Sequence, residues 1–206
     1  MSDSGEVLKY FKAQNEDLKE QLANQKKLNE KLVKQQSQGL TTSTPLINLL
    51  NKTKKLAGTG DLKGPGVVIT LIDSPKANDP TIQGPIDHLL IHAEDILSIV
   101  NELNNAGAEA ISVNDQRITS RTSIRCAGTQ ILVNQEIVAA PFIIRAIGDT
   151  DIIYAGINLP GNIVSDLNLL GMVSIKKSDE VIVKGLTKDT FKFVYAEEVK
   201  PNENED

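Results

Sequence analysis

The stretch "GPGVVITLIDSP", residues 64–75, decides the fold expected for this chain. Pro65 and Gly66 break any preceding helix, and Val67 to Ile72 form a nearly continuous apolar run rich in β-branched residues. Such a run, without regular polar alternation, is typical of a strand in the middle of a sheet. A polar loop containing prolines follows from Ser74 to Pro85. We therefore predict that a central strand opens a globular domain here.

An amphipathic helix is predicted after this loop. Glu94 and Asp95 stand near its start and Gly107 follows its end, as capping preferences favour. Its apolar residues have the helical spacing i, i+3, i+4 and i+7: Ile96, Ile99, Val100 and Leu103. One apolar face indicates a helix that lies across a sheet.

Two passages then repeat one pattern, "ISVNDQRIT" from Ile111 and "ILVNQEIVA" from Ile131. Each places a polar pair between short β-rich arms, so each predicts a tight hairpin with Asn114-Asp115 or Asn134-Gln135 at its tip. The segment "APFIIRAIGD", residues 140–149, predicts one more strand.

The last third of the chain predicts helix and then strands. Helical signals run from Asp151 to Leu170 and are broken at "LPG", residues 159–161. Strands are expected at residues 174–176, 181–183 and 191–195. This order predicts an α+β domain with a ferredoxin-like (split βαβ) sheet, helices on one face and extra β-hairpins.

The N-terminal part predicts a coiled coil. No Gly or Pro occurs from Glu6 to Gln38, and a 3-then-4 spacing runs through Leu8, Phe11, Asn15, Leu18, Leu22, Gln25, Asn29, Leu32 and Gln36. The amides at these seam positions weaken a zipper, and the e positions Lys12, Lys19 and Lys26 find no acid at g in a parallel homodimer. We expect weak self-association or an acidic hetero-partner, and a single solvated helix is the alternative.

These patterns divide the chain into four parts. We expect a coiled-coil stalk at residues 1–39, a connecting helix and linker at 40–63, the ferredoxin-like domain at 64–196 and a disordered acidic tail at 197–206.

Composition excludes several classes of function. Aromatic residues make up only 3% of the chain, tryptophan is absent and the formal net charge is −5, so the chain offers few platforms for stacking on bases and no nucleic acid partner is predicted. No run of 18 or more apolar residues could span a bilayer, and the start "MSDSGEV" lacks a signal-peptide core. As given, the chain is expected to be soluble.

Four segments together resemble a family of unknown function typified by the YlxW and YlxX proteins of Gram-positive bacteria. They are "GPGVVITLIDSP", "NELNNAGAEAISVNDQRITSRTSIRCAGTQILVN", "PFIIRAIGD" and "NLPGNIVSDLNLLGMVSIKKSDEVIV". The resemblance implies an N-terminal membrane helix, a coiled coil and an external globular domain, encoded near division and envelope genes, with no established activity. This chain shows no membrane helix, so we expect an anchor that preceded Ser2 and placed the domain on the extracytoplasmic face of the membrane.

The residues that could perform chemistry do not form a complete catalytic set. His88 and His92 have a spacing that would place two imidazoles on one helix face, but no third metal ligand is identifiable. Cys126 is the one cysteine, and the strand-like segment around it favours core packing over a nucleophile. We therefore predict no catalytic residues, no metal and no cofactor.

The remaining candidate site is the arginine cluster in "QRITSRTSIR", residues 116–125. In extended backbone one face would hold the candidate binding residues Arg117, Arg121, Ser123 and Arg125, together with Thr119. Guanidinium groups beside hydroxyls suit phosphate, carboxylate or acidic protein surfaces. The alternatives are a turn at residues 120–122, which would break the alignment, and arginines that brace backbone carbonyls or acids such as Asp115 and Asp149.

Two functions follow from these observations. The first is a non-enzymatic interaction or scaffold protein of the envelope or division machinery, tethered in its full-length form and oligomeric through the coiled coil. The second is a module that binds a small anionic ligand through the arginine cluster.

Overall fold

The computed structural model describes residues 44–81, 84–128, 130–186 and 194–196. The heptad positions and the acidic tail lie outside the described residues, so the stalk remains a prediction. The chain separates into two compact units, residues 1–53 and 54–206. Helix α2 (Thr44–Leu56) is the first described element, and the elements named below belong to the second unit.

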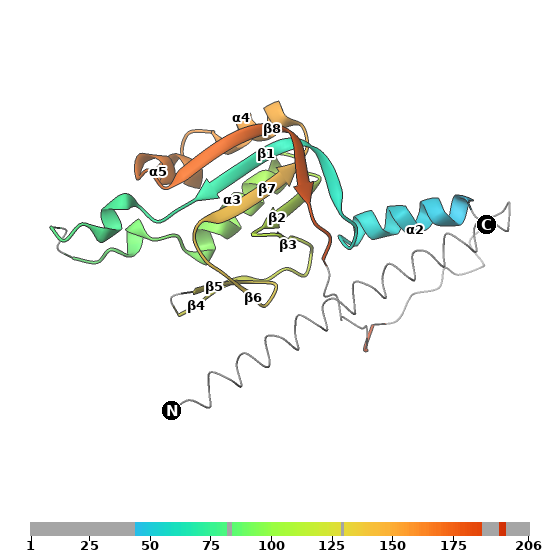
Figure 1. Ribbon diagram of the computed structural model, residues 1–206, viewed down its shortest axis with the longest axis horizontal. Coiled ribbons are helices and arrows are strands. Elements are labelled where there is room, and N and C mark those ends of the chain that lie inside the picture. Colours follow the sequence, from blue (N-terminus) through green and yellow to red (C-terminus); the bar gives the residue numbers. More distant parts are fainter. Residues whose placement is uncertain (1–43, 82–83, 129, 187–193, 197–206) are drawn as a thin grey trace, which may run out of the picture. The chain divides into compact units, whose positions relative to one another are not determined.

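A five-stranded antiparallel sheet forms the centre of the second unit (Figure 1). Its strands occur in the order β3-β2-β7-β1-β8. Their bounds are β1 (Leu62–Leu71), β2 (Ala110–Val113), β3 (Gln116–Arg117), β7 (Phe142–Ile147) and β8 (Val173–Val183). The apolar run of residues 67–72 thus gives the central strand that its composition predicts, with β7 on one side and β8 on the other.

The core lies on one face of this sheet. Val67, Ile69 and Leu71 point to the same side of β1 and are fully buried. Against them pack the helices α3 (Ala93–Asn105), α4 (Thr150–Ile157) and α5 (Ile163–Leu169), which lie together on that side of the sheet (Figure 1). The predicted stripe of α3 is buried, and the predicted break at "LPG" separates α4 from α5, so both expectations are confirmed.

A second, three-stranded antiparallel sheet has the order β4-β5-β6 and lies against α3. Its strands are β4 (Ile124–Ala127), β5 (Gln130–Val133) and β6 (Glu136–Val138). Short 3₁₀ helices at Pro75–Asn78 and Asp87–Leu89 complete the regular structure. Among the described residues, no helix is both long and apolar enough to cross a membrane.

The end of the chain differs from the prediction. The expected separate strands at 174–176 and 181–183 form one strand, β8, whose polar middle lies at the edge of the sheet where solvent accepts charged side chains. Its pairing with β1 shifts between Gly64 and Gly66, so a bulge accommodates the residues that the sequence presents as a gap. Val194 and Tyr195 form an exposed bend, so the strand predicted at 191–195 is wrong for these two residues.

Candidate functional site

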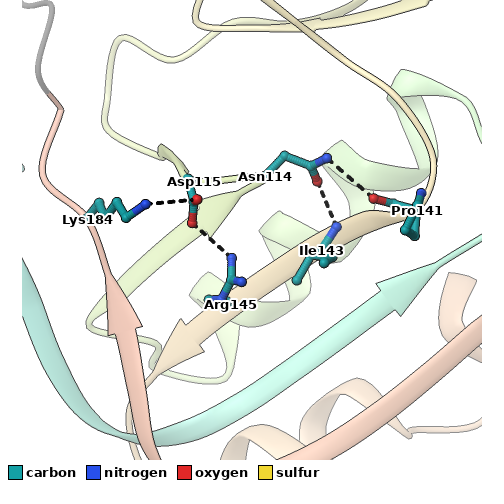
Figure 2. A network of polar contacts seen from close by, with 6 residues as sticks. All are labelled: Asn114, Asp115, Pro141, Ile143, Arg145 and Lys184. Carbon is teal, nitrogen blue, oxygen red and sulfur yellow. Dashed lines mark hydrogen bonds and ion pairs between the residues drawn. The ribbon is translucent and has the colours of Figure 1, made fainter.

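The hairpin between β2 and β3 is fixed by its own turn residues. Asn114 and Asp115 have φ of 44° and 65°, values that a two-residue hairpin turn of type I′ requires. The Asn114 side chain accepts a hydrogen bond from Ile143 N at 2.7 Å and donates to the carbonyl oxygen of Pro141 (Figure 2). It also donates to the carbonyl oxygen of Ala139. The turn is therefore bound to β7 and its preceding loop, which sets the position of β3.

Asp115 forms the ionic half of this network. Its carboxylate accepts from Arg145 at 3.1 Å and from Lys184 at 3.0 Å, and these side chains come from β7 and from the residue after β8 (Figure 2). The three side chains are partly exposed, so each pair contributes modestly to stability. The sequence offers Asp115 as a partner for the arginines of residues 116–125. In the structure Asp115 pairs instead with Arg145, which lies outside that stretch.

Arg117 lies at the end of β3 and is only 3% exposed. Its Nη1 donates to the carbonyl oxygen of Gly60 at 3.3 Å. Burial lowers the pKa of its guanidinium from the ordinary value, and the negative charge of Asp61 opposes that shift. The bracing of a backbone carbonyl that the sequence left open as an alternative is thus observed at this arginine.

A turn at Ser120 and Arg121 separates β3 from β4. The Thr122 hydroxyl accepts from Thr119 N at 2.8 Å, the Thr119 hydroxyl accepts from Arg121 N at 3.3 Å, and Thr122 N donates to Thr119 O at 3.1 Å. Because the backbone turns here, the extended one-face alignment of the cluster does not occur.

The turn divides the candidate residues into two groups. Arg117 and Arg121 line one cavity, whereas Ser123 and Arg125 are exposed at the start of the three-stranded sheet and do not line it. Of the binding residues expected from the sequence, the structure brings together two.

The cavity has a volume of about 430 Å³ and is partly open to solvent. It lies within the second unit, between the end of α2, the corner from α3 to β2, and the turn after β3. Gly58 approaches this turn closely: its φ is +71°, and a Cβ on it would lie 2.7 Å from Thr119 Cγ2. A side chain at Gly58 would therefore displace the wall that presents Arg117 and Thr119.

The lining combines positive charge with apolar surface. Its cationic residues are Lys55, Arg117 and Arg121, its one acid is Glu109, and Thr119 and Ser120 add hydroxyls. The apolar residues are Leu56, Ala57, Ala108, Ala110, Ile111, Ile118 and Leu186. Such a wall offers hydrogen-bond donors to an anion and a surface for an apolar group beside it.

Cys126 corrects another expectation, because it is exposed rather than packed in the core. It lies on β4, an edge strand of the small sheet, and its Sγ accepts from Ala93 N at 3.4 Å at the start of α3. His92 precedes that helix and its ring contacts the carbonyl oxygen of Asp87 at 3.0 Å. The hydrogen bond to Asp87, followed by one with Cys126, raises the pKa of His92 from its ordinary value.

The histidines do not form a metal site with their neighbours. His92 stands at the N-terminus of α3 and Asp95 accepts from its backbone N at 2.8 Å, whereas His88 is exposed. Within the described part of the chain, no group of three or more His, Cys, Asp or Glu side chains could hold a metal ion.

Comparison with known proteins places this architecture in a family. Residues 49–197 match the family described as "Bacterial protein of unknown function (DUF881)". This chain belongs to the DUF881 family. The resemblance seen in the sequence is thereby confirmed.

Relatives of this DUF881 protein include YlxW and YlxX of Bacillus subtilis. YlxW is 32% identical over 148 residues, which cover 68% of this chain and 62% of YlxW, and YlxX is 35% identical over 122 residues, which cover 53% of this chain and 50% of YlxX. The chain thus spans one half to three fifths of these relatives. A crystal structure of an uncharacterized conserved protein from Mycobacterium tuberculosis is similar with a TM-score of 0.57 and 28% identity, over 73% of this chain and 99% of that one.

Sequence reasoning missed part of this candidate site. Lys55 and Glu109 were not candidates, because neither has a local pattern that distinguishes it from other exposed charges. The turn at Ser120 and Arg121 is an alternative that the sequence leaves open, and the signal that favours it is the Thr119 and Thr122 pair, since hydroxyl side chains of this spacing favour turns.

Proposed function

We propose that this protein is a non-enzymatic interaction or scaffold protein of the bacterial envelope, active near the division machinery. In this proposal the full-length form is tethered to the membrane, and the domain lies on its extracytoplasmic face. An N-terminal coiled coil joins copies or partners, and the globular domain binds another component. The membership in DUF881 and the greater length of YlxW and YlxX support a chain with further segments.

We also propose that the domain is a ferredoxin-like sheet with additions. Strands β1, β2, β7 and β8 follow in the chain with α3 after the first and α4 and α5 after the third, and their spatial order is β2-β7-β1-β8. That order, with the helices on one face, supports a split βαβ unit. The strands β3 to β6 are then the extra hairpins, inserted between its second and third strands.

The cavity beside Arg117 and Arg121 is the observation that carries this proposal. It lies where the inserted turn after β3 meets the corner from α3 to β2, so rigid elements hold its walls. Cationic donors beside apolar side chains suit reversible binding of a partner group.

The stalk is tested by sedimentation. The full chain and a version that lacks residues 1–38 are compared over a range of concentrations, alone and with an added acidic coiled-coil partner. We expect the full chain to associate and the shortened one to stay monomeric, because the seam from Leu8 to Leu32 is removed.

A point variant gives the matched control for this test. Leu22→Lys places a charge in the predicted seam and should abolish association, whereas Lys26→Gln alters an e position and should change it little. Monomers at every concentration, with no partner bound, would remove the stalk from the proposal.

The second candidate function is binding of a small anion, and the cavity favours it specifically. An anion that binds the native state raises the melting temperature. We expect phosphate or acetate to raise it in the wild type and in Arg125→Gln, but less in Arg121→Gln, because Arg121 lines the cavity and Arg125 does not. Equal increases in all three proteins would rule out a role for this site.

A further inference from the structure

Arg117 combines deep burial with a place on the cavity wall. An arginine presents five N–H donors and stays charged in proteins. Arg117 is 3% exposed, and among the described residues its guanidinium has one hydrogen-bond acceptor, Gly60 O at 3.3 Å. Each acceptor that reaches a buried cation lowers the free-energy cost of its burial. Because Arg117 lines the cavity, a ligand there can supply a further acceptor.

The second observation is the asymmetry of charge in the wall. Lys55 and Arg121 add positive charge to that of Arg117, and Glu109 is the one opposing acid among the lining residues. The charge of the lining residues is therefore net positive, which favours a ligand that carries negative charge. A planar guanidinium matches the two oxygens of a carboxylate in a bidentate pair.

The third observation is the apolar share of the same wall. Leu56, Ile118 and Leu186 line the cavity together with small alanines. A bare inorganic anion would leave these side chains in contact with water. A volume of about 430 Å³ lies in the range of small-molecule and short-peptide sites, roughly 300–1,000 Å³.

We propose that the cavity binds a peptide carboxylate: a chain end or acidic side chain whose two oxygens meet Arg117 and Arg121 while an adjoining aliphatic group packs on Leu56, Ile118 and Leu186. This inference rests on the proposed function of the domain as a binding module, and it names the chemistry of the partner. The partner is then a protein segment rather than a membrane surface or a free ion.

Calorimetric titration of the full chain with short peptides tests this assignment. The probe is acetyl-Leu-Leu with a free carboxylate, and its amide is the matched control. We expect the carboxylate to bind and the amide to bind about tenfold or more weakly, because the amide cannot accept two charge-assisted hydrogen bonds. Acetate should bind more weakly than the peptide, because it lacks the apolar body.

Variants locate the site. Arg121 is exposed, so Arg121→Gln should fold normally. This variant should bind the peptide about tenfold more weakly. Ala57→Leu should weaken it similarly, because Ala57 is exposed and lines the cavity, which the larger side chain would fill. Arg125→Gln is the control from the same stretch of chain and should bind as the wild type does. Arg117→Lys tests the bidentate pair while keeping the buried charge.

Several results would overturn the proposal. Equal affinity for the carboxylate and the amide, or no change in Arg121→Gln and Ala57→Leu, would exclude a carboxylate in this cavity. Inorganic phosphate that binds as tightly as the peptide would make the site a plain anion site. Binding of phosphatidylglycerol vesicles through Arg121 without binding of the peptide would make it a membrane contact. These measurements do not depend on residues 1–38, so a failure of the stalk and a failure of this site can be told apart.

Discussion

The two hairpins of this domain share a sequence pattern but differ in their surroundings. "ISVN" and "ILVN" lead into turns whose four residues, Asn114, Asp115, Asn134 and Gln135, all have positive φ. In the first turn, the Asn114 side chain binds the backbone of β7. The second turn lies at the end of the small sheet, and its Asn134 side chain donates one hydrogen bond to Arg117 O at 2.8 Å. Local turn chemistry therefore produces both hairpins, and tertiary contacts decide what each one stabilises.

The largest expected difference concerns the two asparagines. Asn114→Ala removes one accepted and two donated hydrogen bonds and leaves Ile143 N without its acceptor, so we expect a loss of about 2–3 kcal/mol in the free energy of unfolding. Asn134→Ala removes one hydrogen bond and should cost about 1 kcal/mol. Urea denaturation of both variants measures the difference, and equal losses would show that the network in Figure 2 does not anchor the first hairpin.

The sequence predicts these hairpins because their signal is local. An asparagine pair between β-rich arms needs no knowledge of distant contacts, and the same holds for the stripe of α3. The cavity is different, since it joins Lys55, Glu109 and Arg121 from three separate parts of the chain. Periodicity cannot place residues that meet only after the sheet has formed.

Two further differences from the prediction have the same physical origin. The burial of Cys126 was expected because its neighbours look like a strand, but that strand is an edge and leaves the thiol exposed. The polar middle of β8 predicts a gap between two strands. At the edge of a sheet, however, one strand can continue through exposed polar residues without alternating with apolar ones. Position in the sheet, which the sequence does not encode locally, decides both.

The second residue of each turn has a positive φ, which glycine adopts without strain. Gln135 has φ of 70° and an exposed side chain, so Gln135→Gly should relieve backbone strain and stabilise the protein by about 0.5–1 kcal/mol. Asp115→Gly relieves similar strain at φ of 65° but loses the contacts to Arg145 and Lys184, so its net effect should be near zero. Melting temperatures of the two variants measure this, and a gain in Asp115→Gly as large as in Gln135→Gly would mean that the ion pairs contribute nothing.

The second hairpin sheet also meets the start of α3, where His92 gives a smaller, pH-dependent effect. Its folded pKa is raised by the Asp87 carbonyl and then by Cys126, with desolvation opposing and Asp87 and Asp95 adding negative charge. Because the pKa of His92 is higher in the folded state, protonation of His92 stabilises the folded protein. This stabilisation is fully present at pH values below the unfolded pKa of about 6.5, and it is lost as the pH rises through the folded pKa.

The urea midpoint of the wild type should therefore fall as the pH rises from about 6 to about 8. His92→Gln should remove this slope, and His88→Gln, whose residue is exposed, serves as the matched control. A slope that persists in His92→Gln would assign it to another group.

The smallest effect is expected at Ser112, the position that distinguishes "ISVN" from "ILVN". Ser112 pairs with Arg117 in the first hairpin, and Leu132 is the corresponding residue of the second. Ser112 is fully buried, and its hydroxyl has no hydrogen-bond partner among the described residues. Because an unpaired buried hydroxyl costs free energy, Ser112→Ala should leave stability unchanged or raise it by up to about 1 kcal/mol. Urea denaturation measures this, with Ser174→Ala on the exposed side of β8 as the control. A loss of about 1 kcal/mol or more would mean that the hydroxyl forms a hydrogen bond in solution.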